Sequence, residues 1–207
     1  MKNKTLSVTL CVAGLLALCV AAGAQTKGKK PENKSKPAAA QPSADDMQNA
    51  MQNAMPGAAH SNLAKLAGEY TTATKAYFEP GAPPQDSTGE AKLWMTLDGR
   101  FLAEDDSANF MGQPTKGFRM IGYNNATKRY EGIMTYTMST SIMTLNGTST
   151  DGGKTITFAG NFNDPSGIKL DIVLRQTSDD QFVIDLSAKT PDGKPGPRLV
   201  TTYTRKK

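Results

Sequence analysis

The sequence predicts an all-β protein, an antiparallel up-and-down barrel of about ten strands preceded by one or two short helices. Three observations predict this fold. Ten short runs rich in β-branched and aromatic residues follow Gly68. Turn-forming residues separate these runs, and almost every connection is too short for a crossover helix. A meander of this length can remove its exposed edges by closing into a ring.

The N-terminus has the pattern of an export signal. Lys2 and Lys4 precede an apolar stretch over residues 6–22, and the small residues 22–24 suit cleavage by a signal peptidase. The apolar stretch is shorter than the roughly 20 residues of a membrane-spanning helix. We therefore expect residues 1–24 to be a signal peptide, the mature protein to be periplasmic or secreted, and no membrane span to remain.

Both cysteines, Cys11 and Cys19, lie inside this predicted signal peptide, so we expect no disulfide in the mature protein. Charge is also divided unevenly. Residues 1–60 carry 7 Lys against 3 acids, whereas residues 61–207 carry 17 Lys or Arg against 16 acids. The folded part is therefore close to neutral and lacks the excess positive charge that phosphate binding requires, which excludes nucleic acid as a partner.

Residues 25–43 are rich in Lys, Pro, Ala and Gln and are expected to be a flexible linker. Residues 44–68 follow as a short helical segment. Ser43 is a suitable N-cap, Pro56 and Gly57 end the first helix, and Ser61 is a suitable cap for a second one ending at Gly68.

Methionines recur every four residues in the first predicted helix, at Met47, Met51 and Met55, and therefore share one face. Two interpretations follow. Methionine fills gaps where a helix packs on an irregular surface. Alternatively, the adjacent pair Met51 and Met55 together with His60, the only histidine, forms a candidate copper site, because soft sulfur suits Cu(I). Packing is the favoured interpretation, and we expect no metal or other cofactor.

From Glu69 onward the pattern is that of ten strands. Their expected ranges are 69–78, 89–97, 100–108, 115–123, 129–137, 139–148, 154–162, 168–176, 181–189 and 198–205. Alternation along several of them predicts the inward residues, which include Ile156 and Phe158, Ile172 and Leu174, and Ile184 and Leu186. A ten-stranded barrel is slightly wider than the eight-stranded kind that holds one small ligand, so an internal cavity is expected.

Four motifs resemble a known family. His60-Ser61-Asn62-Leu63-Ala64-Lys65-Leu66-Ala67-Gly68-Glu69-Tyr70 is similar to the opening motif of the bacterial domain-of-unknown-function family 1579. Residues 97–102 resemble its Leu-Gly-Gly-Arg-Phe-Leu turn, Gly122-Tyr123-Asn124 its Gly-Tyr-Asp turn, and residues 203–206 its closing strand. The resemblance covers about residues 44–207. It implies a lipocalin-like or fatty-acid-binding-like barrel and no established activity.

Several positions are candidates for lining a cavity. Tyr203 and Arg205 share a face of the last strand, where fatty-acid-binding barrels hold a carboxylate with an Arg and a Tyr. Residues 134–144 carry no charge, which predicts a hairpin that is buried or lines the cavity. Its candidate lining residues are Met134, Tyr136, Met138 and Met143, and Trp94 is a further candidate. Residues 104–106, three consecutive acids, are interpreted as an exposed run.

No catalytic constellation is present: the sequence contains no serine elbow, phosphate loop or paired-histidine metal motif. The leading hypothesis is an exported barrel that binds a small lipophilic molecule. An alternative is a non-catalytic envelope interaction module that uses the N-terminal helix and the barrel rim. A hydrolase that uses Asp or Glu at the barrel mouth stays open, because the sequence does not show whether two carboxylates converge. The oligomeric state is not predicted.

Overall fold

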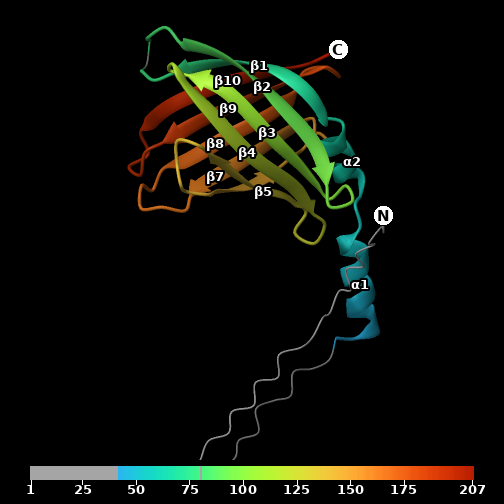
Figure 1. Cartoon of the computed structure of the whole chain (residues 1–207). Helices are drawn as coiled ribbons and strands as arrows, with labels where there is room; N and C mark the ends of the chain where they lie inside the picture. Colours follow the sequence, from blue (N-terminus) through green and yellow to red (C-terminus); the bar gives the residue numbers. More distant parts are fainter. Residues whose placement is uncertain (1–41, 80) are drawn as a thin grey trace, which may run out of the picture. The chain divides into compact units, whose positions relative to one another are not determined.

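Ten antiparallel strands form one closed barrel, as the sequence predicts (Figure 1). The structure is a computed structural model that describes residues 42–79 and 81–207, so the predicted signal peptide and nearly all of the predicted linker lie outside the described residues. The helices are α1 (Ala44–Ala54) and α2 (Ala58–Ala64). The strands are β1 (Gly68–Tyr77), β2 (Gln85–Thr96), β3 (Phe101–Phe110), β4 (Gln113–Asn124), β5 (Arg129–Tyr136), β6 (Met143–Thr148), β7 (Thr155–Phe162), β8 (Lys169–Gln176), β9 (Gln181–Lys189) and β10 (Pro195–Arg205).

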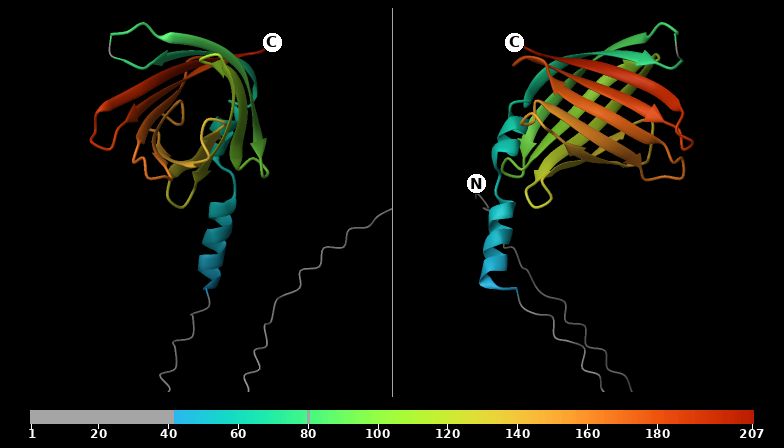
Figure 2. Two further views of the ribbon diagram at one scale, coloured as in Figure 1. Left: turned by 60° about the vertical axis from the view of Figure 1, so that its left-hand side comes forward. Right: turned by 180° about the vertical axis from the view of Figure 1, so that it is seen from behind.

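Each strand pairs with the next one along the chain, and β1 pairs with β10 to close the ring (Figure 2). Alternation is the local cause of this arrangement. In β7, for example, Ile156, Phe158 and Gly160 are buried while the residues between them face outward. The predicted inward residues Ile172, Leu174 and Ile184 are likewise part of the buried core.

Helix α2 closes one end of the barrel. Its side chains Leu63 and His60 are buried, and Leu66, which follows the helix, joins the same core as Tyr70 and Leu93. We refer to this end as the α2 end. The opposite end, which carries the turns β1–β2, β3–β4, β5–β6, β7–β8 and β9–β10, is the mouth.

The start of α2 differs from the expectation. The helix begins at Ala58 with Gly57 as its N-cap, so Ser61 lies inside it rather than capping it. The reason is His60: its Nδ1 accepts a hydrogen bond of 3.0 Å from the Gly57 backbone N–H, which satisfies an amide that a helix start leaves free. The imidazole also packs edge-on against the Tyr123 ring. His60 is therefore a buried capping residue.

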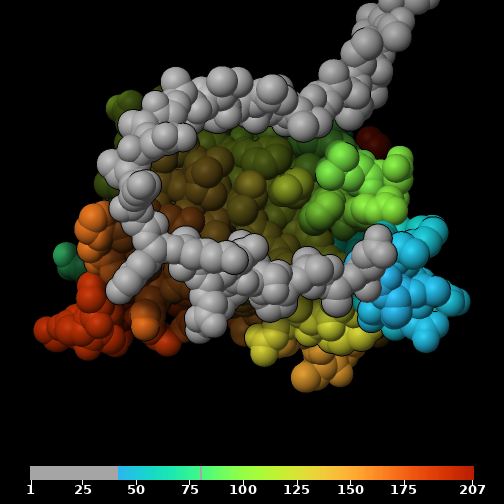
Figure 3. Space-filling model, turned by 90° about the horizontal axis from the view of Figure 1, so that it is seen from below, coloured from blue at the N-terminus to red at the C-terminus, as the bar shows by residue number. Residues whose placement is uncertain are grey.

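Helix α1 begins as predicted, with Ser43 and Asp46 forming a reciprocal capping box. Its methionine face, however, is not packed against the described part of the chain: Met47, Met51 and Met55 are 56%, 72% and 61% exposed. In the space-filling view α1 is the blue projection at the edge of the molecule (Figure 3). The helix contacts the barrel through its C-terminal carbonyls, which accept hydrogen bonds from Arg100 and Asn125.

Neither described helix has the length and apolar character needed to cross a lipid bilayer.

Arg205 fastens α2 to the barrel. Its guanidinium donates hydrogen bonds of 2.7 Å to the Ala67 carbonyl and 2.8 Å to the Lys65 carbonyl, and it lies 4.9 Å from the centre of the Tyr70 ring. Gly68 leaves room for it, because a Cβ at that position would overlap the guanidinium. These contacts satisfy carbonyls at the C-terminal end of α2 that the helix itself leaves free.

We expect Arg205→Ala to lower the free energy of unfolding by about 2–3 kcal/mol, because it removes two charge-assisted hydrogen bonds and a cation–π contact. Urea unfolding measures the loss. Lys206→Ala is the matched control: it removes a neighbouring positive charge whose ion pair with Glu90 is solvent-exposed, so we expect less than about 1 kcal/mol. Equal losses in the two variants would show that Arg205 does not hold α2.

Candidate functional site

The interior of the barrel has two halves that differ in packing. Toward the α2 end, inward side chains such as Tyr70, Tyr130 and Phe158 are at most 3% exposed and fill the space. Toward the mouth, most inward side chains keep partial exposure; these include Thr74, Asp106, Ala108, Met134, Tyr136, Phe162, Leu186 and Thr201. Because these side chains point inward, their exposure shows that the interior is less completely filled toward the mouth than toward the α2 end.

A buried charged cluster lies between the two halves. Glu104 on β3 and Arg119 on β4 form an ion pair and are only 3% and 9% exposed. Tyr203 on β10 completes the cluster: its hydroxyl donates a hydrogen bond of 2.9 Å to Glu104 Oε1 and accepts one of 3.3 Å from Arg119 Nη2. We call these three residues the Glu–Arg–Tyr triad. Their polar groups satisfy one another, as buried polar groups must.

Register and small residues position the triad. Glu104 stands directly opposite Arg119 in the β3–β4 ladder, so the two side chains share the inner face. Tyr203 reaches them from β10 across the inner faces of β1 and β2, where the inward residues include Thr72, Gly89 and Ala91. Because these side chains are short, they leave the path from β10 to β3 open. The Tyr203 ring stacks on Phe182 at 4.2 Å, which fixes its direction.

The triad keeps Arg119 charged and Tyr203 neutral. Burial acts to lower the pKa of the Arg119 guanidinium, but the negative charge of Glu104 and hydrogen bonds to Glu104 and Tyr203 raise it above its usual value. Burial, followed by the charge of Glu104, raises the pKa of the Tyr203 hydroxyl far above its usual range. The positive charge of Arg119 is therefore present, and Glu104 already compensates it.

Asp106 is the next inward residue on β3 beyond Glu104. It lies opposite Ala91 on one side and Gly117 on the other, and a Cβ on Gly117 would overlap its carboxylate. Burial and the charge of Glu104 raise the pKa of Asp106 to about 6, and Arg119 offsets this only in part. No hydrogen bond or ion pair joins the Asp106 side chain to another residue within 42–79 and 81–207. Asp106 is therefore a free carboxylate inside the mouth.

The inner surface of the mouth is polar on one side and apolar on the other. The polar wall is formed by β10 and β1–β4; its polar members are Thr72, Thr74, Glu104, Asp106, Arg119 and Thr201, and the inward residues Ala76, Ala108 and Leu199 of the same strands are apolar. The apolar wall is formed by β5–β9, and its members include Met134, Tyr136, Met143, Phe162, Leu170 and Leu186. Such a division suits a molecule with one polar end and an apolar body.

The structure brings four of the predicted cavity residues to this interior. Met134 and Met143 lie opposite each other in the β5–β6 ladder, Tyr136 stands opposite Gly117, and Tyr203 belongs to the triad. Three others lie elsewhere: Trp94 is on the outer face, since its neighbour Leu93 points inward, Met138 is 62% exposed in the β5–β6 loop, and Arg205 is held at the α2 end. The arginine beside Tyr203 is Arg119, not Arg205.

The copper candidates are not arranged as a ligand set. Met51 and Met55 are exposed on α1, while His60 is buried and its Nδ1 is occupied by the Gly57 amide. Within the described ranges, no group of three or more His, Cys, Asp or Glu is placed to hold a metal ion.

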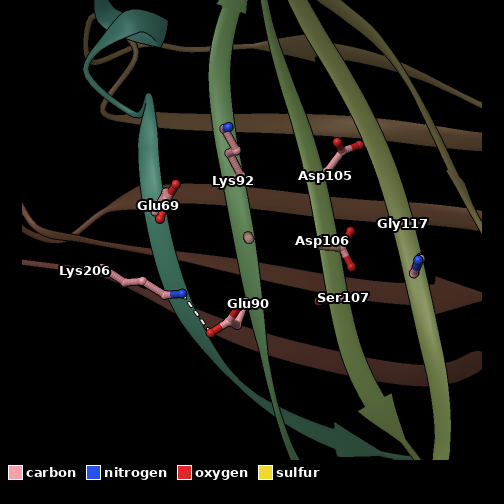
Figure 4. A pocket seen from close by; sticks show the side chains of 10 residues that line it. Glu69, Glu90, Lys92, Asp105, Asp106, Ser107, Gly117 and Lys206 are labelled. Atoms are coloured by element: carbon pink, nitrogen blue, oxygen red, sulfur yellow. Dashed lines mark hydrogen bonds and ion pairs between the residues drawn. The ribbon is translucent and has the colours of Figure 1, made fainter.

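A second concave feature lies on the outer surface of β1–β4 (Figure 4). This groove has a volume of about 520 Å³, and its charged side chains alternate in sign: Lys92, Lys116 and Lys206 lie among Glu69, Glu90 and Asp105. Lys206 and Glu90 form an ion pair of 2.8 Å across it. The groove is also lined by Ala91, Asp106 and Gly117, which stand opposite one another in the β2–β3 and β3–β4 ladders. Its remaining charged side chains are exposed and of both signs, so the mouth, where an apolar wall faces Asp106, is the stronger candidate for a binding site.

The interpretation of residues 104–106 as an exposed run is wrong for two of the three. Asp105 is exposed, but Glu104 is buried and Asp106 is half-buried inside the barrel. A signal for this was present: Leu102, Glu104 and Asp106 share one face of a strand, and the first of them is apolar. Two carboxylates therefore share the inner face of β3, but Glu104 is bound by Arg119 and Tyr203, so only Asp106 is free to act on a ligand.

The model of the family described as Protein of unknown function (DUF1579) matches residues 55–205 of the chain. The chain belongs to DUF1579. The match begins after α1 and ends with the last residue of β10, so for this DUF1579 protein it spans the complete barrel together with α2. The sequence resemblance is thus confirmed.

Solved structures of low sequence identity share the barrel of this DUF1579 protein. The Rv2717c protein of M. tuberculosis aligns with a TM-score of 0.56 at 16% identity, over 74% of this chain and 100% of its own. The S-type phycobiliprotein lyase CPES of Guillardia theta aligns with a TM-score of 0.52 at 11% identity, over 76% of this chain and 97% of its own. At these identities the likeness shows the fold. No curated protein matches the chain.

The ion pair of the triad generates a prediction about stability. We expect Arg119→Met to lower the free energy of unfolding by about 3–5 kcal/mol, because it leaves the Glu104 carboxylate buried without a counter-charge. The double variant Glu104→Met with Arg119→Met should lose clearly less, since it buries no charge. Urea unfolding of the two single variants and the double variant measures the coupling. Losses that simply add up would show that the two charges do not interact inside the barrel.

Proposed function

We propose that this protein binds a small lipophilic molecule in the mouth half of its barrel. The observation that carries the proposal is the partial exposure of inward side chains at the mouth, above a filled α2 end. A solvent-accessible interior with an apolar wall gains free energy when an apolar molecule replaces the water. The inner boundary of the mouth half is formed by the triad and by the aromatic cluster around Tyr70 and Phe182, whose hydrogen bonds and ring contacts hold it rigid.

The methionines of the apolar wall support a lipophilic ligand. Met134 is partly exposed, and its unbranched, polarizable side chain adapts to irregular apolar surfaces, whereas Met143 opposite it in the β5–β6 ladder is buried in the core. Tyr136 adds an aromatic ring beside them, and burial raises the pKa of its hydroxyl. Met134 and Tyr136 therefore provide apolar contact area that can adapt to ligands of different shapes.

A second candidate function is an interaction module, and the exposed methionine face of α1 favours it. Met47, Met51 and Met55 present an apolar stripe that no described residue covers. Deleting residues 25–57 separates the two functions. Ligand binding by the barrel should survive the deletion, because the mouth lies at the end opposite α2. Loss of ligand binding would place the ligand site on the N-terminal segment.

We also propose that the protein is exported through residues 1–24, on the sequence pattern of a basic start, an apolar stretch and a small-residue cleavage site. N-terminal sequencing of protein purified from its own host tests this proposal. The expected first residue is Gln25, recovered from the extracytoplasmic fraction. An intact Met1 in the cytoplasmic fraction would overturn it.

If the ligand binds in the mouth, a large side chain that points into the mouth should strongly reduce ligand binding. We expect Leu199→Trp, which points inward on β10, to lower the occupancy of a co-purifying lipophile by about tenfold, because the indole fills the space that the ligand needs. Native mass spectrometry of protein purified from its own host measures the occupancy.

Val200→Trp is the matched control, because Val200 is adjacent on the same strand and faces outward. It should keep the occupancy of the unmodified protein. Equal occupancy in the two variants would place the ligand outside the mouth. A protein that always purifies without any bound molecule, and takes up none of a panel of lipophiles, would contradict the proposed function itself.

A further inference from the structure

Asp106 is placed where a ligand in the mouth would meet it. Its neighbours in the two ladders are Ala91 and Gly117, so no long side chain covers the carboxylate from either adjacent strand. Gly117 is needed there, since a Cβ would overlap the carboxylate oxygen. Opposite Gly117 on the next strand stands Tyr136 of the apolar wall. The carboxylate thus lies at the boundary between the polar wall and the apolar wall.

The charges around Asp106 favour a positive ligand group. Glu104 is the nearest acid on the inner face of β3, and Arg119 on β4 is the nearest cation, but these two are paired with each other and with Tyr203. Asp105 is adjacent in sequence and faces outward. The inner surface therefore carries one unpaired negative charge when Asp106 is ionised, and no unpaired positive charge among the residues that the structure describes.

This arrangement argues against a fatty-acid type of recognition. A ligand carboxylate needs a guanidinium that is free to bind it with two hydrogen bonds. The Arg119 guanidinium is engaged by Glu104, and Arg205 is held by two backbone carbonyls at the α2 end. An anion in the mouth would instead lie close to Asp106, and the repulsion would weaken its binding.

We propose that the ligand is a cationic amphiphile, an amine or a related nitrogen base with an apolar body, whose positive head group pairs with Asp106 while its body lies against Met134 and Tyr136. This inference rests on the proposed function and specifies the chemistry of that same site. A cation at Asp106 would neutralise a carboxylate that burial and Glu104 hold in an unfavourable charged state above about pH 6.

Three probes with the same apolar chain test the head group: decylamine, decanol and decanoate, each titrated below its micelle concentration by calorimetry. At pH 8 we expect the unmodified protein to bind decylamine more tightly than decanol, and decanol more tightly than decanoate. In Asp106→Asn the affinity for decylamine should fall by about tenfold, because the substitution removes one charge-assisted hydrogen bond between the amine and the carboxylate. The affinity for decanol, which carries no charge, should not change.

Asp105→Asn is the matched control, because it removes the same charge from the adjacent residue on the outer face. It should leave all three affinities unchanged. The pH gives a second readout. The affinity for decylamine should weaken by roughly fivefold to tenfold from pH 8 to pH 5, as Asp106 is protonated, and this change should be absent in Asp106→Asn.

Each result separates the head-group inference from the proposed function. Equal binding of decylamine and decanol, unaffected by Asp106→Asn, would overturn the inference and leave a barrel that binds lipophiles without regard to charge. Tightest binding of decanoate would also overturn it and would show that Arg119 is free to bind anions. If none of the three probes binds, both the inference and the proposed binding of lipophiles fail.

Discussion

The pairing of β1 with β10 is the constraint on which the rest of the structure depends. The two strands form a ladder from Tyr70 opposite Arg205 to Tyr77 opposite Arg198, and this ladder turns a sheet with two edges into a ring. Without it, the inner faces of the strands would be open to water, and neither the buried triad nor the partly exposed interior of the mouth could form. The first and last strands are also far apart in sequence, so ring closure must overcome the entropy of nearly the whole folded chain.

The triad links this closure to the register of the strands. Tyr203 on the last strand donates its hydrogen bond to Glu104, which lies 99 residues earlier on β3. A shift of β3 against β4 by one residue would turn Glu104 outward and leave Arg119 inside without a counter-charge. The penalty for burying that charge is several kcal/mol, so slipped arrangements are disfavoured even where an apolar core would tolerate them. The triad thus specifies one register as well as forming the floor of the mouth.

Alternation and turn residues were sufficient to predict the class of the fold. All ten strands were found, because inward apolar residues repeat every second position in runs such as Ile156 and Phe158. Alternation also places Met134, Tyr136 and Tyr203 inside. What the sequence could not supply is the partner of each charged residue, because Glu104 and Arg119 become neighbours only through the register of β3 and β4. Likewise, Arg205 shares a face with Tyr203, but the position of α2 at the barrel end, which decides what Arg205 binds, is a tertiary feature.

The two walls of the mouth follow from the topology of a meander. In an up-and-down barrel, strands that are neighbours in sequence are neighbours in space, so a change of composition along the chain becomes a difference between two sides of the interior. The inward positions of β3 and β4 carry Glu104, Asp106 and Arg119, whereas those of β5–β9 carry Met, Leu, Ile and aromatic residues. Because Glu104 and Arg119 cancel each other, Asp106 alone sets the charge of the polar wall at neutral pH. The proposed cationic amphiphile would therefore be oriented by two separate interactions, burial of its body against β5–β9 and pairing of its head group with a single carboxylate on β3.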